Sequence, residues 1–281
     1  MDTETTPQTA VTVNQILERY ERDCLPELAP RTQKDYTRHL AKLRRVFGSA
    51  VAAELRPKDF GEFLNVKRGK VQRVKQLAVL SAAFTQAVSF WYCLERNVLR
   101  DVKRPKSQPR DRLVTDAEFK AIRSIASLRI QLAMDLAVMT GQRQGDLLSM
   151  KWADIRDMAI HIYQTKTGKR LAIEITPDLE AVLDRCWLLP RRSEYVLSTR
   201  KGTRYTGEGF RACWQRMMRK AMRRGVLAER FTFHDLRALA ATRCATPEIA
   251  MRLLGHSNIS MTMRVYRRGV ERVKALQLSP T

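Results

Sequence analysis

The stretch LGHSNISMTMRVY, residues 254–266, decides how the second half of this 281-residue chain is interpreted. A glycine suited to ending a helix is followed at once by one of the chain's four histidines. Tyr266 comes ten residues after His256, with two arginines directly behind it. Packing explains the stretch as a turn and then a helix with a half-buried aromatic side chain. Chemistry offers a second interpretation, in which the histidine and the tyrosine converge on one reacting group through the turn.

The charge of the chain indicates the class of its partner. It carries 52 Lys and Arg residues against 29 Asp and Glu, a formal net charge of +23, and its pI is about 10.4. Such an excess opposes compaction through self-repulsion and is typical of proteins that bind a polyanion. The cations are spread along the chain, which favours an extended surface that contacts DNA or RNA. Binding to a membrane surface is less favoured, because no long basic amphipathic helix with an aromatic face is present.

The cysteines, the N-terminal segment and one uncharged run indicate the cellular environment of the protein. The five cysteines form no C-x-x-C pair, which predicts neither a disulfide framework nor a zinc site, and indicates a reducing, intracellular environment. The polar, acidic start of the chain is not typical of a signal peptide. Residues 77–94 carry no charge and are long enough for a membrane span, but their Ser, Thr and Gln residues favour a buried helix of a compact helical domain.

The first half predicts a helical domain over residues 12–102, after a disordered lead at 1–11. Apolar residues recur at helical spacing in four segments: 13–25, 32–47 with Thr32 as its cap, 56–67, and 77–94 extended backward through 67–75. Residues 103–113 then combine prolines with charges of both signs and no apolar periodicity, which predicts a linker. Its cations fit contact with a phosphate backbone as well as they fit a solvated hinge: Lys103, Arg104, Lys106 and Arg110.

The second half predicts a mostly α domain over residues 114–270, with a small antiparallel sheet. Thr115 and Glu118 form a capping-box pattern at the start of a helix over 118–127. Two β-rich runs flank a T-G-K turn in HIYQTKTGKRLAIEI, residues 161–175, which predicts a hairpin. Further helices are predicted at 130–140, 176–187, 207–225, 234–245, 246–255 and 260–276.

Four stretches of this domain carry the candidate chemistry. They are TGQRQGDLLSMKWADI with Arg143, TKTGK with Lys166 or its rival Lys169, HDLRALAAT with His234 and Arg237, and the opening stretch with His256 and Tyr266. Each alone is also typical of ordinary helix ends, turns and surfaces. Together, and in this order, they resemble the tyrosine recombinase, or phage integrase, family, whose pattern is T-G-x-R-x-x-E-L, a hairpin lysine, H-x-x-R, then L-G-H and a tyrosine about ten residues on.

The resemblance covers residues 112–270, and the helical first domain resembles the family's core-binding domain. Three places depart from the family pattern: Asp146 stands where glutamate is usual, Ala238 where a second histidine is frequent, and Asn97-Val98 where Asn-Pro is frequent before the linker. The family's additional N-terminal arm-binding domain is expected to be absent, because the helices begin near residue 12. A C-terminal tail is expected at 271–281, and the short amphipathic stretch after Tyr266, residues 267–281, could dock on a neighbouring protomer.

The residue types suit phosphodiester chemistry without a metal. Charge builds on the phosphate oxygens as phosphorus becomes five-coordinate, and enzymes stabilise it with metal ions or fixed cationic donors. No carboxylate cluster accompanies the motifs, so we predict neither metal nor cofactor. Arg143 and Arg237 can grip phosphate oxygens with planar forks, and His256 can donate a further hydrogen bond. A phenol with a pKa of about 10 needs nearby cations or a base, and His234 is the candidate base for Tyr266.

The resemblance implies the remaining features of the function. Lys166 would protonate the departing 5′-oxygen, leaving a 3′-phosphotyrosyl link that a second strand can reverse without ATP. The expected protein is a site-specific recombinase of a phage or mobile element. It would act as a homotetramer on two double-stranded DNA sites in the cytoplasm of a bacterial host, with accessory DNA-bending or directionality factors where these are required.

Two alternatives remain open. A resolvase of the Xer type, or a nicking-rejoining enzyme like a type IB topoisomerase, would use the same site. A non-enzymatic DNA-binding regulator would keep only the fold, and the complete set of six residues argues against it. A basic helix at 207–225 fits the DNA major groove about as well as it fits a solvated face, with these cations: Arg211, Arg216, Arg219 and Lys220.

Overall fold

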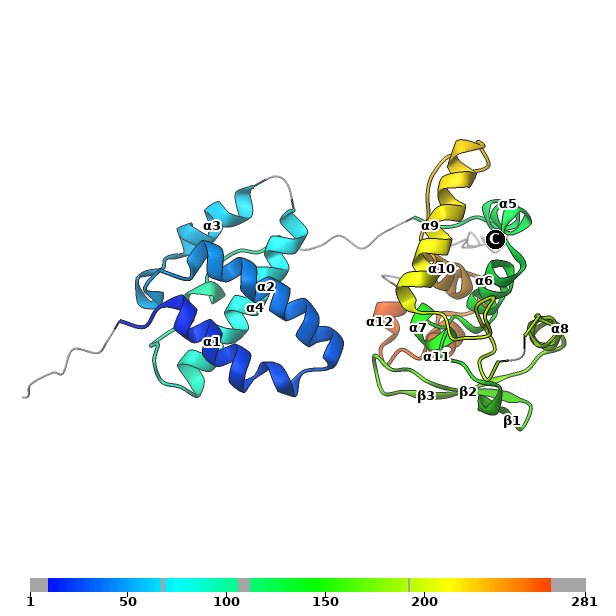
Figure 1. The fold of residues 1–281 in the computed structure, drawn as a ribbon, viewed down its shortest axis with the longest axis horizontal. Coiled ribbons are helices and arrows are strands. Elements are labelled where there is room, and N and C mark those ends of the chain that lie inside the picture. Colours follow the sequence, from blue (N-terminus) through cyan, green and yellow to red (C-terminus); the bar gives the residue numbers. More distant parts are fainter. Residues whose placement is uncertain (1–9, 67–68, 106–111, 192, 264–281) are drawn as a thin grey trace, which may run out of the picture. The chain divides into compact units, whose positions relative to one another are not determined.

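The computed structural model describes residues 10–66, 69–105, 112–191 and 193–263 (Figure 1). The chain divides into two compact units, Met1–Gln108 and Pro109–Thr281. Most of the predicted lead and tail lie outside the described residues, as do most of the predicted helix at 260–276 and the middle of the linker. No helix in the described part of the chain has the length and apolar character needed to cross a membrane.

The first unit is a bundle of helices built around one apolar segment. Its helices are α1 (Val13–Asp23), α2 (Pro30–Phe47), α3 (Pro57–Asn65) and α4 (Lys70–Ser89), with short 3₁₀ turns between α1 and α2 and between α2 and α3. The uncharged stretch predicted to be buried lies mainly in α4, which packs against the other three helices. Leu77, Leu80 and Phe84 of α4 have no exposed surface. The prediction of a buried helix in a compact helical domain is therefore confirmed.

Two details of this unit differ from the sequence prediction. Helix α2 begins at Pro30, which suits a first helical turn because that turn needs no backbone N–H donor. Thr32 therefore lies inside the helix, and its prediction as the cap was wrong. Helix α4 ends at Ser89 rather than near residue 94, because the amides of Trp91 and Cys93 bond back to carbonyl groups of the last turn.

The second unit places helices around one almost fully buried helix, α6 (Leu128–Thr140). This helix packs against α5 (Asp116–Ile125), α8 (Pro177–Trp187) and α10 (Asp235–Arg243). The remaining helices are α7 (Gln144–Leu147), α9 (Gly207–Arg223), α11 (Pro247–Leu254) and α12 (Ile259–Met261). Thr115 and Glu118 form the predicted capping box at the start of α5. Gly141 and Gly255, both with positive φ, end α6 and α11.

An antiparallel sheet of three strands lies along one edge of this unit (Figure 1). Strands β2 (Ala159–Tyr163) and β3 (Arg170–Glu174) form the predicted hairpin, with His161 opposite Ala172. Strand β1 (Ile155–Arg156) was not predicted. It joins β2 through Asp157 and Met158, which both have positive φ, so the tight turn forms without the glycine or asparagine that usually signals it.

Candidate active site

Arg237 is the centre of the candidate site. It lies in the first turn of α10, and only 1% of its surface is exposed. Its guanidinium donates hydrogen bonds to the carbonyl of Gly141 at the end of α6, and to the carbonyl of Leu254 at 2.6 Å. It also lies 3.1 Å from Nε2 of His256. One buried cation thus joins the C-terminal ends of two helices to the histidine that follows the second of them.

His256 is buried beside this arginine because Gly255 turns the chain inward. Gly255 has a φ of 68°, and a Cβ there would lie 2.7 Å from Nε2 of Gln164, so no other residue fits without a shift. His256 is 4% exposed, and its Nδ1 lies 2.8 Å from Oγ1 of Thr262. Since an arginine can only donate, Nε2 accepts from Arg237 and the single ring proton sits on Nδ1, facing the threonine.

The electrostatics of the site keep His256 neutral. Burial lowers the pKa of its imidazole most, and the positive charges of Arg237, Arg143 and Lys169 lower it further, to about 4. An imidazole of such low pKa is uncharged at neutral pH. A cluster of fixed positive charge around a neutral ring is the environment that a phosphate anion would complete.

Arg143 approaches the same place from the other side. It is the N-cap residue of α7 and follows the last residue of α6, Thr140, by three positions. Its side chain is half-buried. Its Nη1 donates to Oε1 of Gln164 at 2.9 Å. Gln164 follows strand β2, so this bond links the arginine to the hairpin.

The hairpin turn holds the two candidate lysines differently. Lys166 and Lys169 are both exposed on the turn, but Nζ of Lys169 also lies 3.5 Å from the carbonyl oxygen of His256. The turn is anchored by Asp146, whose Oδ1 accepts from the backbone N–H of Thr165 at 3.2 Å. Asp146 therefore contacts the hairpin. The prediction that Lys166, rather than Lys169, protonates the leaving group stays a prediction.

His234 and Tyr266 complete the predicted set. His234 is the N-cap residue of α10 and is exposed, one helical turn before the buried Arg237. The backbone N–H of Arg237 donates to its carbonyl at 3.1 Å. Tyr266 lies outside the described residues, so the role predicted for it stays a prediction.

The predicted DNA-contact residues are mostly exposed. Lys103 is exposed, and Arg104 is half-buried and donates to the carbonyl of Leu99 at 3.1 Å, while Lys106 and Arg110 lie outside the described residues. Helix α9 turns an apolar face that includes Trp214 inward. Its predicted cations are exposed: Arg211, Arg216, Arg219 and Lys220. This arrangement fits both interpretations of the helix.

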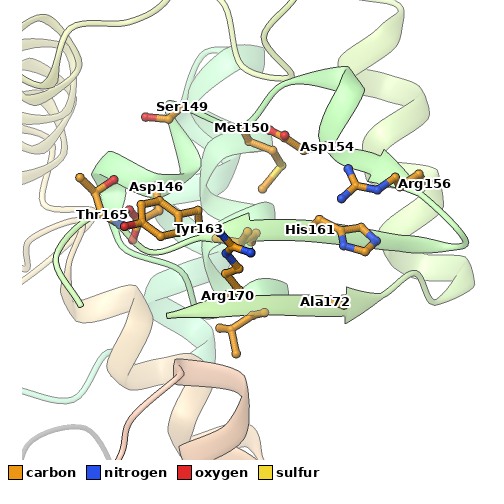
Figure 2. A pocket seen from close by; sticks show the side chains of 12 residues that line it. Asp146, Ser149, Met150, Asp154, Arg156, His161, Tyr163, Thr165, Arg170 and Ala172 are labelled. Carbon is orange, nitrogen blue, oxygen red and sulfur yellow. Dashed lines mark hydrogen bonds between the residues drawn. The ribbon is translucent and has the colours of Figure 1, made fainter. Parts of the chain in front are cut away.

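A cavity of about 770 Å³ adjoins the site on the sheet (Figure 2). Asp146 and Thr165 lie at one end of it and His161 and Arg156 at the other. Within the described residues, no three His, Cys, Asp or Glu side chains gather in a way that would hold a metal ion.

Two buried glutamines near the site were missed by the sequence prediction. Gln142 and Gln164 are 1% and 0% exposed, and both bond within the candidate site. A signal for Gln164 was present, because it continues the alternation of the buried Ile160 and Ile162 along one face of the strand. A polar side chain at an inward-facing strand position is expected to have bonding partners there.

Comparison with known proteins agrees with this geometry. The profile of the phage integrase family matches residues 112–271. The integrase of Escherichia phage HK022 is 32% identical over 273 residues, which cover 91% of this chain and 75% of the relative. The integrase of Escherichia phage lambda is 30% identical over 90% of this chain and 75% of its own length. The chain belongs to the phage integrase family of tyrosine recombinases.

Solved structures extend the likeness to both units. A lambda integrase (75–356) dimer bound to a COC′ core site superposes with a TM-score of 0.83 and 26% identity, covering 96% of this chain and all of that one. A lambda integrase tetramer bound to a Holliday junction gives 0.81 and 27% identity, covering 95% of this chain and 81% of that one. The mostly helical fold with its small antiparallel sheet is that of the lambda integrase catalytic domain.

Proposed function

We propose that the protein is a site-specific DNA recombinase that cuts and rejoins DNA through a covalent 3′-phosphotyrosyl intermediate. One observation supports this most. Arg237 bonds directly to the carbonyl of Leu254, and Arg143 reaches the same carbonyl through Gln164, beside a neutral, buried His256. Two guanidinium groups fixed in this way offer donors to the non-bridging oxygens of one phosphate.

The proposed reaction exchanges one phosphate ester bond for another. The phenol oxygen of Tyr266 attacks phosphorus, and the bond from phosphorus to the 5′-oxygen breaks. His234 accepts the phenol proton, and Lys166, or Lys169 in its place, donates a proton to the leaving oxygen. For His256 to donate a hydrogen bond to the phosphate, its ring proton must leave Nδ1, which faces Thr262, for Nε2, which accepts from Arg237 in the described arrangement. A 5′-hydroxyl of a second strand then reverses the step, so neither a metal ion nor ATP is consumed.

The proposed partner is double-stranded DNA, held by phosphate contacts. The net charge of +23 and the exposed cations of α9 support an affinity that falls steeply with salt. We propose that four protomers act on two DNA sites in the cytoplasm of a bacterial host, with accessory DNA-bending or directionality factors where required. Support for the tetramer comes from the fold shared with the lambda integrase tetramer on a Holliday junction.

A resolvase is the second candidate. The tyrosine recombinase XerA of Thermococcus onnurineus is 26% identical over 94% of this chain and 95% of its own length. Its likeness thus spans both units. A resolvase would use the same site and differ in the DNA it joins.

The decisive experiment uses DNA with a nick beside a candidate site, in the presence of a chelator. The wild-type protein should form a covalent adduct with this DNA, and Tyr266→Phe should form none. A lack of adduct on any DNA would favour a regulator without enzymatic activity. A strand-exchange assay with two sites then separates a recombinase from a nicking-rejoining enzyme.

A further inference from the structure

A chain of buried amides lies beneath the two arginines. Gln164 has no exposed surface, and both ends of its amide are fully used. Its Oε1 accepts from Nη1 of Arg143 at 2.9 Å and from Oγ1 of Thr167 at 3.0 Å. Its Nε2 donates to Oε1 of Gln142 at 2.8 Å and to the carbonyl of Leu254 at 2.9 Å.

Gln142 fixes which way this amide points. Its Nε2 faces two carbonyl oxygens, those of Thr140 and Leu253, each at 2.9 Å. Since a carbonyl can only accept, Gln142 must turn its own oxygen toward Gln164. Gln164 donates to that oxygen through its NH₂ group, which leaves its Oε1 to accept from Arg143. The acceptor presented to Arg143 is therefore set by the surrounding backbone.

The carbonyl of Leu254 accepts hydrogen bonds from both Gln164 and Arg237. It accepts from Nε2 of Gln164 and from Nη2 of Arg237, the latter at 2.6 Å. Arg143 is thus connected to Arg237 through one side chain and one carbonyl oxygen. Thr167 attaches the turn that carries Lys166 to the same side chain.

We propose that Gln164 is a positioning residue, which sets the spacing of the two arginines and couples the lysine-bearing turn to them. The chemistry assigned to it rests on the proposed function. Two guanidiniums can hold one phosphate well only at a fixed separation, and misplacement of such groups slows a reaction steeply. A glutamate at this position would lose both donations and would bind Arg143 by charge, in competition with the phosphate.

The test replaces the amide and measures rate and affinity separately. Gln164→Met keeps an unbranched side chain of similar length and removes all four bonds. With saturating nicked DNA, we expect adduct formation to slow on the order of 10- to 100-fold, while the dissociation constant for DNA changes by less than about twofold. A residue that supports only the fold would lower the folded fraction and leave the rate of bound enzyme unchanged.

A matched control is available on α6. Gln131 is half-buried, and its amide donates to the carbonyl of Ala126 at 3.0 Å. Gln131→Met makes the same chemical change in the same unit, away from the described site contacts. It should leave both the rate and the affinity at their wild-type values.

A second variant protects the test from a folding failure. Thr167→Val removes only the hydroxyl bond to Gln164, and Thr167 is exposed, so the fold should tolerate it. We expect a rate loss of about two- to fivefold at saturation. In an Arg143→Lys background, Gln164→Met should add little, because its effect acts through Arg143.

The outcomes separate this proposal from the one it rests on. Wild-type rates at saturation for folded Gln164→Met, or for Thr167→Val if the first variant does not fold, would overturn the positioning role alone. If the wild-type protein and Gln131→Met also give no adduct, the recombinase function falls first and the positioning role falls with it.

Discussion

The candidate site has a buried half and an exposed half. Arg237, His256 and Gln164 are at most 4% exposed and bond to one another or to the same backbone carbonyl. His234 and Lys166 are exposed, on a helix N-cap and on a hairpin turn. The groups assigned to hold the phosphate are thus set by the packing of helices, and the groups assigned to move protons are not. Substitutions in the buried half should change stability and chemistry together, and those in the exposed half chemistry alone.

The largest effect is expected at Arg237. Arg237→Ala should slow adduct formation on the order of 10³-fold, because a fixed cationic donor to the phosphate is lost. It should also lower the free energy of unfolding by about 1–3 kcal/mol, because the carbonyl of Gly141 loses the donor described here. Single-turnover cleavage and urea denaturation measure the two changes.

Arg143→Ala is the partner variant for this prediction. Arg143 is half-buried, so the cleavage rate should fall comparably with a smaller change in stability. If Arg237→Ala is as stable as the wild type, the packing role of the buried half is wrong.

The next largest effect is expected at His234, the exposed residue proposed as the base. His234→Ala should slow adduct formation on the order of 10²-fold, as loss of a general base does. The melting temperature should stay close to the wild-type value, because the side chain is exposed at the start of α10. A stability loss equal to that of Arg237→Ala would erase the distinction between the two halves.

The two lysines sharpen the comparison further. Lys166→Met should slow cleavage on the order of 10-fold or more, and Lys169→Met less, if Lys166 is the acid. A substrate with sulfur in place of the leaving 5′-oxygen needs no protonation, so it should restore the rate of the variant that lacks the acid. Restoration of Lys169→Met instead would move that role to the lysine beside the carbonyl of His256.

The smallest effect concerns the pH dependence of stability. The pKa of His256 is lowered from 6.5 to about 4 in the folded protein. Between these values the unfolded chain binds a proton that the folded chain does not, so stability is lost as the pH falls through this window. His256→Asn should therefore lose less melting temperature than the wild type between about pH 7 and pH 5. Equal losses in thermal denaturation would contradict a buried neutral imidazole.

Features specified by neighbouring residues could be predicted from the sequence. Thr115 and Glu118 cap α5 through bonds within one turn, and Gly255 ends α11 with a positive φ that favours glycine. Strand β1 was missed because its turn places Met158, a type that rarely adopts positive φ, where a glycine would have signalled a hairpin. Local patterns thus predicted these two helix ends, where the residue types are the usual ones for the conformation.

The site divides in the same way. Arg143, Arg237 and His256 could be named from ordered motifs, but their mutual contacts depend on the ends of α6 and α11 meeting in space. Gln142 and Gln164 lie 22 positions apart, so no local sequence pattern predicts the hydrogen bond between their side-chain amides. Only the three-dimensional fold reveals that these two glutamines connect the residues named from the motifs.

The most direct measurement identifies the amino acid that becomes bonded to DNA. Wild-type protein would be trapped on a nicked site, digested with protease and nuclease, and its DNA-linked peptide sequenced by mass spectrometry. Our account predicts a nucleotide 3′-phosphate on the phenol oxygen of Tyr266. A linkage to any other residue, or a cleaved site with no linkage at all, would contradict it.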